Sequence, residues 1–188
     1  MIGGWFTFLP PRIEDAERED VSDLADLQGL SFLREWSEGE IALLMAGTGV
    51  FALVIRRGAP TASRRSIGFV LVRAVADEAE ILTIAVHPRW RGRGLGQKLM
   101  EAAMRKLYAD RILKIFLEVE SGNEVARALY ERLGFKVVGE RKGYYAAPES
   151  AVPDATPATA LIMRREMTPP PRPRKGTRNG GPEPDKAA

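Results

Sequence analysis

The chain has 188 residues, 45% of them hydrophobic and 28% charged, a balance that predicts one soluble globular domain. It has no cysteine and one histidine, which excludes disulfides, thiolate metal sites and a cysteine nucleophile and leads us to expect no bound metal. No apolar run reaches the roughly 18 residues of a membrane span. The apolar start at residues 2–9 lacks the basic residues of a signal peptide, so we predict a cytoplasmic protein.

The net charge of +3 belongs to the end of the chain. Residues 168–188 hold five basic and two acidic side chains and six prolines, whereas the rest of the chain sums to zero. We predict a Pro-rich, basic, disordered tail at residues 168–188, a domain at residues 20–167 and an N-terminal extension at residues 1–19. The neutral domain argues against direct nucleic-acid binding, which leaves the tail as either an inert extension or an arm toward RNA.

Hydrophobic periodicity predicts the secondary structure in chain order. Residues 1–20 show no clear period and are expected to form a loosely attached leader. After them we expect helices at residues 21–30 and 38–46, strands at 50–55, 67–76 and 81–86, a helix from 95, a strand at 112–120, a helix at 121–133, and strands at 135–138 and 159–163. This order predicts an α/β fold with a mixed sheet, in which the strands at 81–86 and 112–120 are parallel because a helical crossover joins them.

Local signals support several of these boundaries. Ser37 followed by Glu40 predicts a capping box for the second helix. Ser121 or Asn123 is expected to start the fourth helix, and Gly134 is expected to end it as a left-handed cap. The Pro- and Ala-rich residues 146–157 predict a long loop.

The strand at 81–86 is followed by a turn and by residues 91–96, Arg-Gly-Arg-Gly-Leu-Gly, which open a helix. Glycines let the backbone approach a ligand closely, and the N–H groups of a helix start attract phosphate, to which Arg91 and Arg93 add charge. The alternative is that the glycines only make a tight turn. A P-loop requires Lys and then Ser or Thr at the positions of Gln97 and Lys98, so a P-loop is excluded. A dinucleotide-binding fingerprint requires a third glycine where Gln97 stands, which weakens that alternative but leaves it open.

Two side chains near the predicted carboxyl ends of the strands could carry chemistry. Alternation places Glu118 on the face opposite its apolar neighbours Leu117 and Val119. A carboxylate on such a strand indicates an ion pair or a nearby cleft, and the alternative is a solvated strand end. Tyr130 is expected at the edge of the apolar stripe of its helix, where a structural role is the alternative.

Together these segments resemble the GCN5-related N-acetyltransferases (GNAT). Residues 91–96 resemble the Gln/Arg-x-x-Gly-x-Gly/Ala acetyl-CoA signature of that family, and residues 117–119 and 128–135 resemble the second half of its core. Within the family, the chain resembles the RimI-type alanine N-acetyltransferases, which modify the N-terminus of small-subunit ribosomal protein eighteen. That narrower resemblance also uses Phe32, Trp36 and residues 80–86, and the whole covers roughly residues 20–167.

The resemblance implies a fold, a cosubstrate and roles for residues. It implies a GNAT-like sheet whose parallel strands at 81–86 and 112–120 splay around acetyl-CoA, with Glu118 as general base and Tyr130 as general acid in a direct transfer. The implied coenzyme contacts are Ile84, Ala85, Val86, Arg91, Gly92, Arg93, Gly94, Leu95, Gly96, Gln97 and Asn123. The implied substrate contacts are Trp36, Tyr144 and Tyr145.

The implied function is acetylation of the α-amine of an N-terminal alanine. The expected partner is a ribosomal protein, and no association with a membrane is expected. The alternatives are a GNAT enzyme that acts on lysine or a small-molecule amine, and a non-catalytic acyl-CoA-binding module. The chain departs from the RimI pattern in its N-terminal extension, in the insertion after Tyr145 and in its basic tail. Because the family contacts substrate where the insertion lies, the peptide preference stays open.

Overall fold

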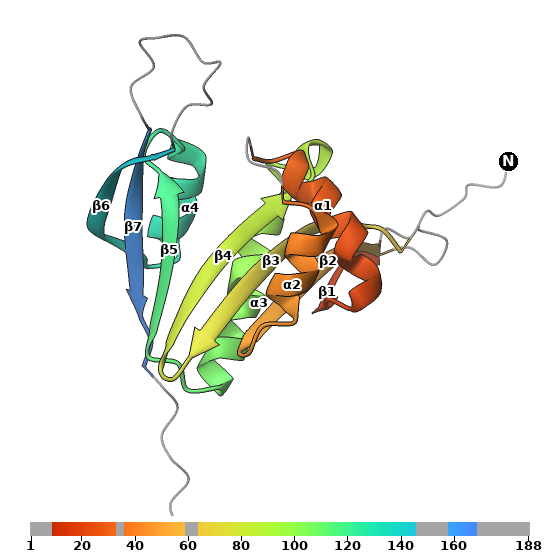
Figure 1. Ribbon diagram of the computed structural model, residues 1–188, viewed down its shortest axis with the longest axis horizontal. Coiled ribbons are helices and arrows are strands. Elements are labelled where there is room, and N and C mark those ends of the chain that lie inside the picture. The colour runs from red at the N-terminus through yellow and green to blue at the C-terminus, as the bar shows by residue number, and fades with distance from the viewer. Residues whose placement is uncertain (1–8, 33–35, 59–63, 146–157, 169–188) are drawn as a thin grey trace, which may run out of the picture.

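The computed structural model describes residues 9–32, 36–58, 64–145 and 158–168, and in that part of the chain seven strands form one sheet in the order β1-β2-β3-β4-β5-β7-β6 (Figure 1). The strands are β1 (Leu9–Asp15), β2 (Val50–Gly58), β3 (Ser66–Val75), β4 (Glu78–Val86), β5 (Lys114–Glu120), β6 (Lys136–Tyr145) and β7 (Ala158–Glu166). The helices are α1 (Val21–Gly29), α2 (Glu38–Met45), α3 (Leu95–Ala109) and α4 (Glu124–Arg132), with short 3-10 helices η1 (Arg18–Asp20) and η2 (Pro88–Trp90). The predicted α/β fold with a mixed sheet and a parallel β4–β5 pair is confirmed.

The first half of the sheet, β1 to β4, is antiparallel and carries helices on both faces. On one face α1 and α2 share a core cluster with β2, β3 and β4 that includes Leu24, Ile41 and Phe69. On the other face α3 buries Leu99 and Met100 completely. The middle of β2 and of β3 is therefore a continuous apolar run, because a strand covered on both faces has no solvent side.

The second half of the sheet, β5, β7 and β6, carries a helix on one face. α4 lies on the same face as α3, and its Tyr130 and the following residue Leu133, at its C-cap, belong to the same core cluster. The odd-numbered residues of β5 from 115 to 119 are buried in that cluster, whereas Phe116, Glu118 and Glu120 alternate with them on the opposite face. The alternation predicted for this strand is confirmed.

The predicted capping residues lie at the helix ends. The Ser37 hydroxyl accepts a hydrogen bond from the Glu40 N–H at 3.2 Å, and the Glu40 carboxylate accepts one from the Ser37 N–H at 2.8 Å, which confirms the capping box of α2. Asn123 caps α4 by accepting from the Ala126 N–H at 3.1 Å. Gly134 follows that helix with φ of +83°, as the left-handed cap requires.

The prediction of a loosely attached leader at residues 1–20 is wrong for the residues that the structure describes. β1 pairs with β2 from Leu9↔Gly58 to Asp15↔Leu53, and η1 follows it. Two prolines and several charged residues interrupt the apolar pattern of β1, which is why periodicity did not indicate a strand. Proline is tolerated here because β1 lies at the edge of the sheet.

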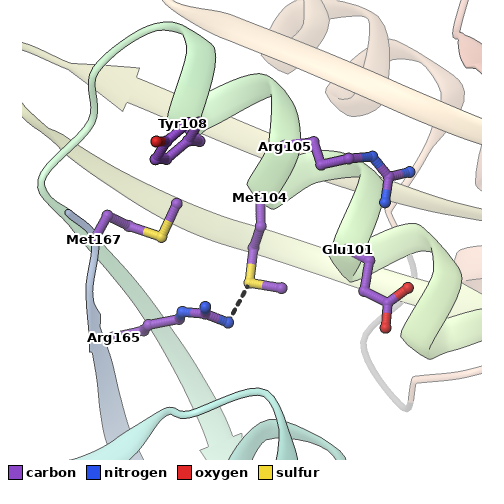
Figure 2. A pocket seen from close by; sticks show the side chains of 6 residues that line it. All are labelled: Glu101, Met104, Arg105, Tyr108, Arg165 and Met167. Carbon is purple, nitrogen blue, oxygen red and sulfur yellow. Dashed lines mark hydrogen bonds between the residues drawn. The ribbon is translucent and has the colours of Figure 1, made fainter. Parts of the chain in front are cut away.

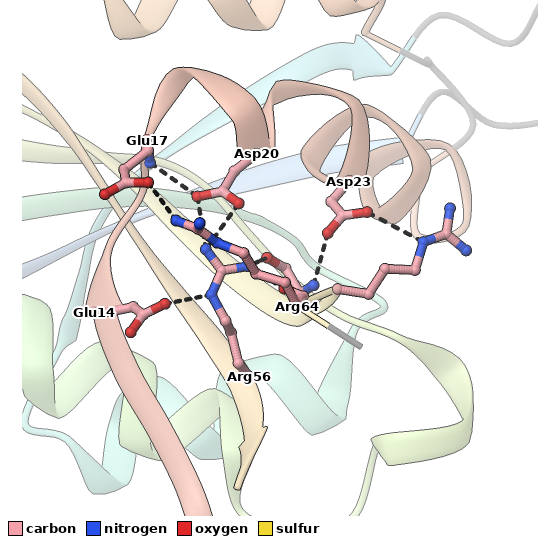
Figure 3. A network of polar contacts seen from close by, with 8 residues as sticks. Glu14, Glu17, Asp20, Asp23, Arg56 and Arg64 are labelled. Carbon is pink, nitrogen blue, oxygen red and sulfur yellow. Dashed lines mark hydrogen bonds and ion pairs between the residues drawn. The ribbon is translucent and has the colours of Figure 1, made fainter. Parts of the chain in front are cut away.

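A buried ion pair connects η1 to β2 (Figure 3). The Arg56 guanidinium donates to both carboxylate oxygens of Asp20, at 2.8 and 2.9 Å, and also to Glu14 and Ser66. Arg56 and Asp20 are only 7% and 3% exposed. Burial lowers the pKa of Arg56, but the hydrogen bonds to Asp20 and Glu14 outweigh burial and raise it, so this group stays charged through the neutral range.

Three strands extend further than predicted. β2 reaches Gly58, β6 reaches Tyr145 and β7 reaches Glu166, against expected ends at residues 55, 138 and 163. The added residues of β6 and β7 are largely polar, so apolar alternation gives no signal there. β6 is an edge strand, whereas the added residues of β7 pair with β5. The expected loop at 146–157 lies outside the described residues, as does the expected disordered tail at 168–188 apart from its first residue.

Candidate active site

β4 and β5 pair over only four residues and then separate. The parallel pairing runs from Glu78↔Lys114 to Ile81↔Leu117, although β4 continues to Val86. Figure 1 shows the two strands meeting at one end of the sheet and diverging toward the other. We call the region in which residues 82–86 of β4 and residues 118–120 of β5 no longer pair with each other the wedge. In open α/β sheets, ligands bind at the carboxyl ends of parallel strands, where the wedge opens.

β4 contains a bulge where it leaves β5. Val72 of β3 pairs with Ile81 and Leu71 pairs with Thr83, so Leu82 is an extra residue in β4. A bulge bends its strand and increases the local twist, which turns the following residues away from β5. Residues 84–86 keep their pairing with β3, and their other edge borders the wedge. The sequence did not reveal this bulge, because a continuous apolar run looks the same with and without one.

Among the described residues, no hydrogen-bond partner is found for the first backbone N–H groups of α3, which lie at the open end of β4. The first helical hydrogen bond runs from the Lys98 N–H to the Gly94 carbonyl, so the N–H groups of residues 95–97 precede the helical ladder. Gly92 and Gly94 have φ of +73° and +72°, a left-handed conformation that favours glycine, and a Cβ at either position would meet no atom within 4 Å. The loop therefore leaves room for an anion next to these N–H groups.

The two arginines of this loop point to different places. The Arg93 guanidinium lies 4.8 Å from the centre of the Trp90 ring, and Arg57 of β2 lies 5.4 Å from the same ring. Arg91 instead donates from Nε to the Val86 carbonyl at 2.9 Å and from Nη2 to the Ser31 hydroxyl at 3.0 Å. Positive charge thus collects around the loop, as the sequence predicted, but Arg91 also makes contacts that the sequence did not indicate.

Glu118 lies one residue beyond the last β4–β5 pair, at the closed end of the wedge. Its side chain is 23% exposed and forms an ion pair with Arg141 of β6 at 3.0 Å. It alternates with the buried residues of β5, so it points to the face opposite α3 and α4. The predicted carboxylate therefore borders the wedge, and its ion-pair partner was not predicted because it comes from a distant strand.

Tyr130 is more deeply buried than we expected for a residue at the edge of the apolar stripe of its helix. It is 6% exposed and packs edge-on against Phe135, with ring centres 6.0 Å apart. Its neighbour Leu129 is only half-buried. Tyr130 lies on the α3 and α4 face, whereas Glu118 lies on the opposite one, so β5 separates the two side chains.

The remaining predicted contacts come from three separate segments of the chain. Asn123 serves as the cap of α4, the structural alternative to a ligand contact. Trp36 is half-buried against the core cluster under α1 and α2. Tyr144 and Tyr145 are the last residues of β6, and their backbone lies at the end of the sheet toward which the wedge opens, because β6 and β5 both run antiparallel to β7.

A separate cavity of about 320 Å³ lies away from this site (Figure 2). Four of its lining residues come from α3, and two come from the end of β7 and the residue that follows it: Glu101, Met104, Arg105, Tyr108, Arg165 and Met167. Arg165 is held there by the Leu133 carbonyl and, at 3.1 Å, by the Met104 sulfur. Among the described residues, no group of three or more His, Asp or Glu could hold a metal ion, and no helix is long and apolar enough to cross a membrane.

Comparison with known proteins identifies the class that this fold and this loop define. Residues 19–135 match the family model of the acetyltransferase (GNAT) family, so the chain belongs to that family and is an acyltransferase. It is 30% identical to the ribosomal protein bS18-alanine N-acetyltransferase of Haemophilus ducreyi over 151 residues, which cover 80% of this chain and 97% of that protein. The predicted family and the predicted resemblance to alanine N-acetyltransferases are confirmed.

Solved structures agree with this assignment. The crystal structure of the ribosomal-protein-S18-alanine N-acetyltransferase from Escherichia coli matches with a TM-score of 0.75 and 25% identity, over 87% of this chain and 97% of that one. NAA60 from Arabidopsis thaliana, solved in complex with acetyl-CoA, shares the fold with a TM-score of 0.69 and 18% identity, over 84% of this chain and 99% of that one.

Proposed function

We propose that the protein transfers the acetyl group of acetyl-CoA to the α-amine of an N-terminal alanine, and that its acceptor is a ribosomal protein of the bS18 kind. The observation that carries this proposal is the wedge, which has the free N–H groups of α3 at its open end and Glu118 at its closed end. The names of the relatives at 30% and 25% identity support the choice of acceptor.

The loop ahead of α3 fits the diphosphate of the coenzyme. The N–H groups of residues 95–97 and the positive end of the helix favour an anion, and the glycines at 92 and 94 leave open space beside them. We assign residues 92–97 to the diphosphate, with Arg91 and Arg93 adding charge. Residues 84–86, whose outer edge borders the wedge, would line the path of the pantetheine arm, with Asn123 approaching from α4.

Glu118 is the proposed general base. In the reaction, the amine nitrogen bonds to the thioester carbonyl carbon, the carbon–sulfur bond breaks, and the amine loses a proton that Glu118 accepts directly or through one water. Its carboxylate points to the face that α4 does not cover, so an acceptor can approach it. Arg141 holds the carboxylate in one position through the 3.0 Å ion pair.

Tyr130 is the proposed general acid toward the departing thiolate. It lies on the face that carries α3 and α4, the same face as the proposed coenzyme loop. A tyrosine hydroxyl can donate a proton, and its burial at 6% exposure limits competition from bulk water. The acid and the base would then act from opposite sides of β5, one on the coenzyme and one on the acceptor.

Simple acid–base chemistry favours an N-terminal amine over a lysine. An α-amine has a pKa near 8 and a lysine amine one near 10.4, so deprotonating the α-amine at neutral pH costs about 3 kcal/mol less. A single carboxylate base suits the easier acceptor. The end of β6 at Tyr144 and Tyr145 and the segment around Trp36 are the proposed walls of the peptide groove.

The test is mass spectrometry of products formed from acetyl-CoA and a panel of amines. The panel contains a peptide with a free N-terminal alanine, the same peptide with a blocked N-terminus and an internal lysine, and a polyamine. We expect acetyl transfer to the free alanine alone. Transfer to lysine or to the polyamine would replace the proposed acceptor, and coenzyme binding without transfer to any amine would indicate an acyl-CoA-binding module.

A further inference from the structure

The side chain of Arg91 reaches from the coenzyme loop to the end of α1. Its Nε donates to the Val86 carbonyl at 2.9 Å, and its Nη2 donates to the Ser31 hydroxyl at 3.0 Å and lies 3.5 Å from the Leu30 carbonyl. Val86 is the last residue of β4, and Leu30 and Ser31 directly follow α1. One side chain therefore connects the loop, the strand end and the helix end.

A second, buried contact holds the same helix end against β4. The Thr83 hydroxyl donates to the Gln28 side-chain oxygen at 3.0 Å, and these residues are 7% and 3% exposed. The Gln28 carbonyl in turn accepts from the N–H groups of Ser31 and Phe32, each at 3.0 Å. The end of α1 is thus positioned by a fixed contact to Thr83 and by the exposed bridge from Arg91.

This helix end lies on the side of the sheet that the acceptor would use. α1 packs on the face opposite α3, which is also the face to which Glu118 points. Leu30 and Phe32 are 51% and 40% exposed, so two large apolar side chains stand at the surface there. We define residues 29–32 as the acceptor wall.

Arg91 can donate a hydrogen bond to an anion while its other nitrogens connect Val86 to Ser31. A guanidinium has five N–H donors in a rigid planar fork. Nε and Nη2 lie along one edge of that fork and are used by the protein, whereas Nη1 makes no hydrogen bond within the described residues. Gly92, the next residue, begins the loop that we assign to the diphosphate. A phosphate oxygen at Nη1 would therefore leave the bridge intact.

We propose that Arg91 is a positioning residue that couples coenzyme binding to the acceptor wall. A diphosphate bound at Nη1 restrains the guanidinium, and the restrained Nε and Nη2 then hold Leu30 and Ser31 in place. The inference rests on the proposed function and extends it by linking the two substrate sites. Reciprocity requires the acceptor to tighten coenzyme binding by the same factor, and for so exposed a side chain we expect the low end of the usual range, about fivefold.

The test is amide hydrogen exchange of the full chain with and without saturating coenzyme A. In the unmodified protein, coenzyme A should slow exchange at Leu30, Ser31 and Phe32 by about fivefold. Arg91→Lys keeps the charge but loses the fork, so the coenzyme-dependent slowing should disappear even when calorimetry shows the site to be full. Ser31→Ala should reduce the slowing without changing coenzyme affinity, because only one end of the bridge is lost.

Arg93→Ala is the matched control, since it removes an arginine from the same loop that stacks on Trp90 and does not bridge. It should weaken coenzyme binding yet keep the full slowing at saturation. Slowing that persists in Arg91→Lys, or that is absent in the unmodified protein with coenzyme bound, would overturn the inference. Neither result depends on acetyl transfer, so the peptide panel judges the proposed function separately.

Discussion

The two halves of the sheet on either side of the wedge differ in how their faces are covered. β1 to β4 lie between α1 and α2 on one face and α3 on the other, with two core clusters and a buried ion pair (Figure 1). Within the part of the chain that the structure describes, β5, β7 and β6 carry α4 on one face, and their other face holds charged residues, among them Glu118, Arg141 and Arg164.

We infer from this difference that the covered half binds the coenzyme and that the other half supplies the base for the acceptor amine. The covered half packs against helices on both faces, which favours a fixed arrangement of the N–H groups of α3 for the coenzyme. The uncovered face of the other half keeps a carboxylate accessible, which a base acting on an incoming amine requires. The four predictions below test this division, from the largest expected effect to the smallest.

The largest effect is expected for Glu118→Gln, which keeps the shape of the side chain and removes its basicity. Turnover with an N-terminal alanine peptide should fall by about 10²- to 10⁴-fold, the usual contribution of a general base, because no group then accepts the amine proton. Coenzyme affinity should stay within about twofold, because the proposed diphosphate contacts at residues 92–97 belong to the other half. Steady-state kinetics and calorimetry measure the two quantities.

The matched control is Glu120→Gln, two residues along the same face but exposed. It should leave turnover within about twofold. Equal losses in both variants would mean that the charge of this face, rather than one base, supports the reaction. Unchanged turnover in Glu118→Gln would remove Glu118 from the base role.

Asp20→Ala should lower the stability of the covered half. Removing one partner of a buried ion pair leaves an uncompensated charge and costs about 3–5 kcal/mol, and we expect the lower end because Glu14 still contacts Arg56. Urea unfolding measures the loss. Asp26→Ala removes an exposed partner of Arg65 and should cost below about 1 kcal/mol. Similar costs would show that burial of the Arg56 pair adds nothing.

Gly94→Val should weaken coenzyme A binding by about 100-fold, roughly 2.8 kcal/mol. A non-glycine residue at φ of +72° is strained by about 1–2 kcal/mol, so the loop would shift and move the N–H groups of residues 95–97. Gly122→Val is the control, since its Cβ also meets open space but its backbone needs no left-handed conformation. Calorimetry that finds normal binding in Gly94→Val would contradict the diphosphate assignment.

The sequence predicted the middle of the fold better than its edges. Strong apolar patterns mark the central elements β3, β4, α3 and β5, because each packs its apolar residues into the core. β1 was missed and β6 was predicted too short because edge strands carry prolines and polar residues that hide the period of two. Local signals at Ser37, Asn123 and Gly134 worked because caps depend on neighbouring residues only.

The features of the candidate site also divide into those that the sequence could predict and those that it could not. The glycine loop and the face of Glu118 could be predicted, because each follows from spacing within a few residues. The bulge at Leu82, the Glu118–Arg141 ion pair and the bridge from Arg91 to Ser31 could not. Each joins positions distant in the chain or depends on strand register, for which a single sequence carries no local signal. Whether these residues bind acetyl-CoA stays a prediction.

The smallest effect concerns the end of the β4–β5 pairing that lies farthest from the wedge. Lys114 and Glu78 are the first pair of the β4–β5 ladder, and their side chains form an exposed ion pair at 3.0 Å. The hydrogen bond to Glu78 is the main reason that the pKa of Lys114 is raised, against a small lowering by burial. A raised pKa in the folded state stabilises the fold below the ordinary lysine pKa, and this stabilisation is lost only as pH rises through the raised value.

NMR titration should therefore show the pKa of Lys114 falling back toward its ordinary value in Glu78→Gln. Glu80→Gln should leave it unchanged, because that carboxylate pairs with Arg73 at 2.6 Å. Neither variant should alter stability near pH 7 by more than the small amount typical of exposed pairs, since backbone pairing of four residues closes the wedge. A large loss in Glu78→Gln alone would instead show that this charge pair keeps the two halves together.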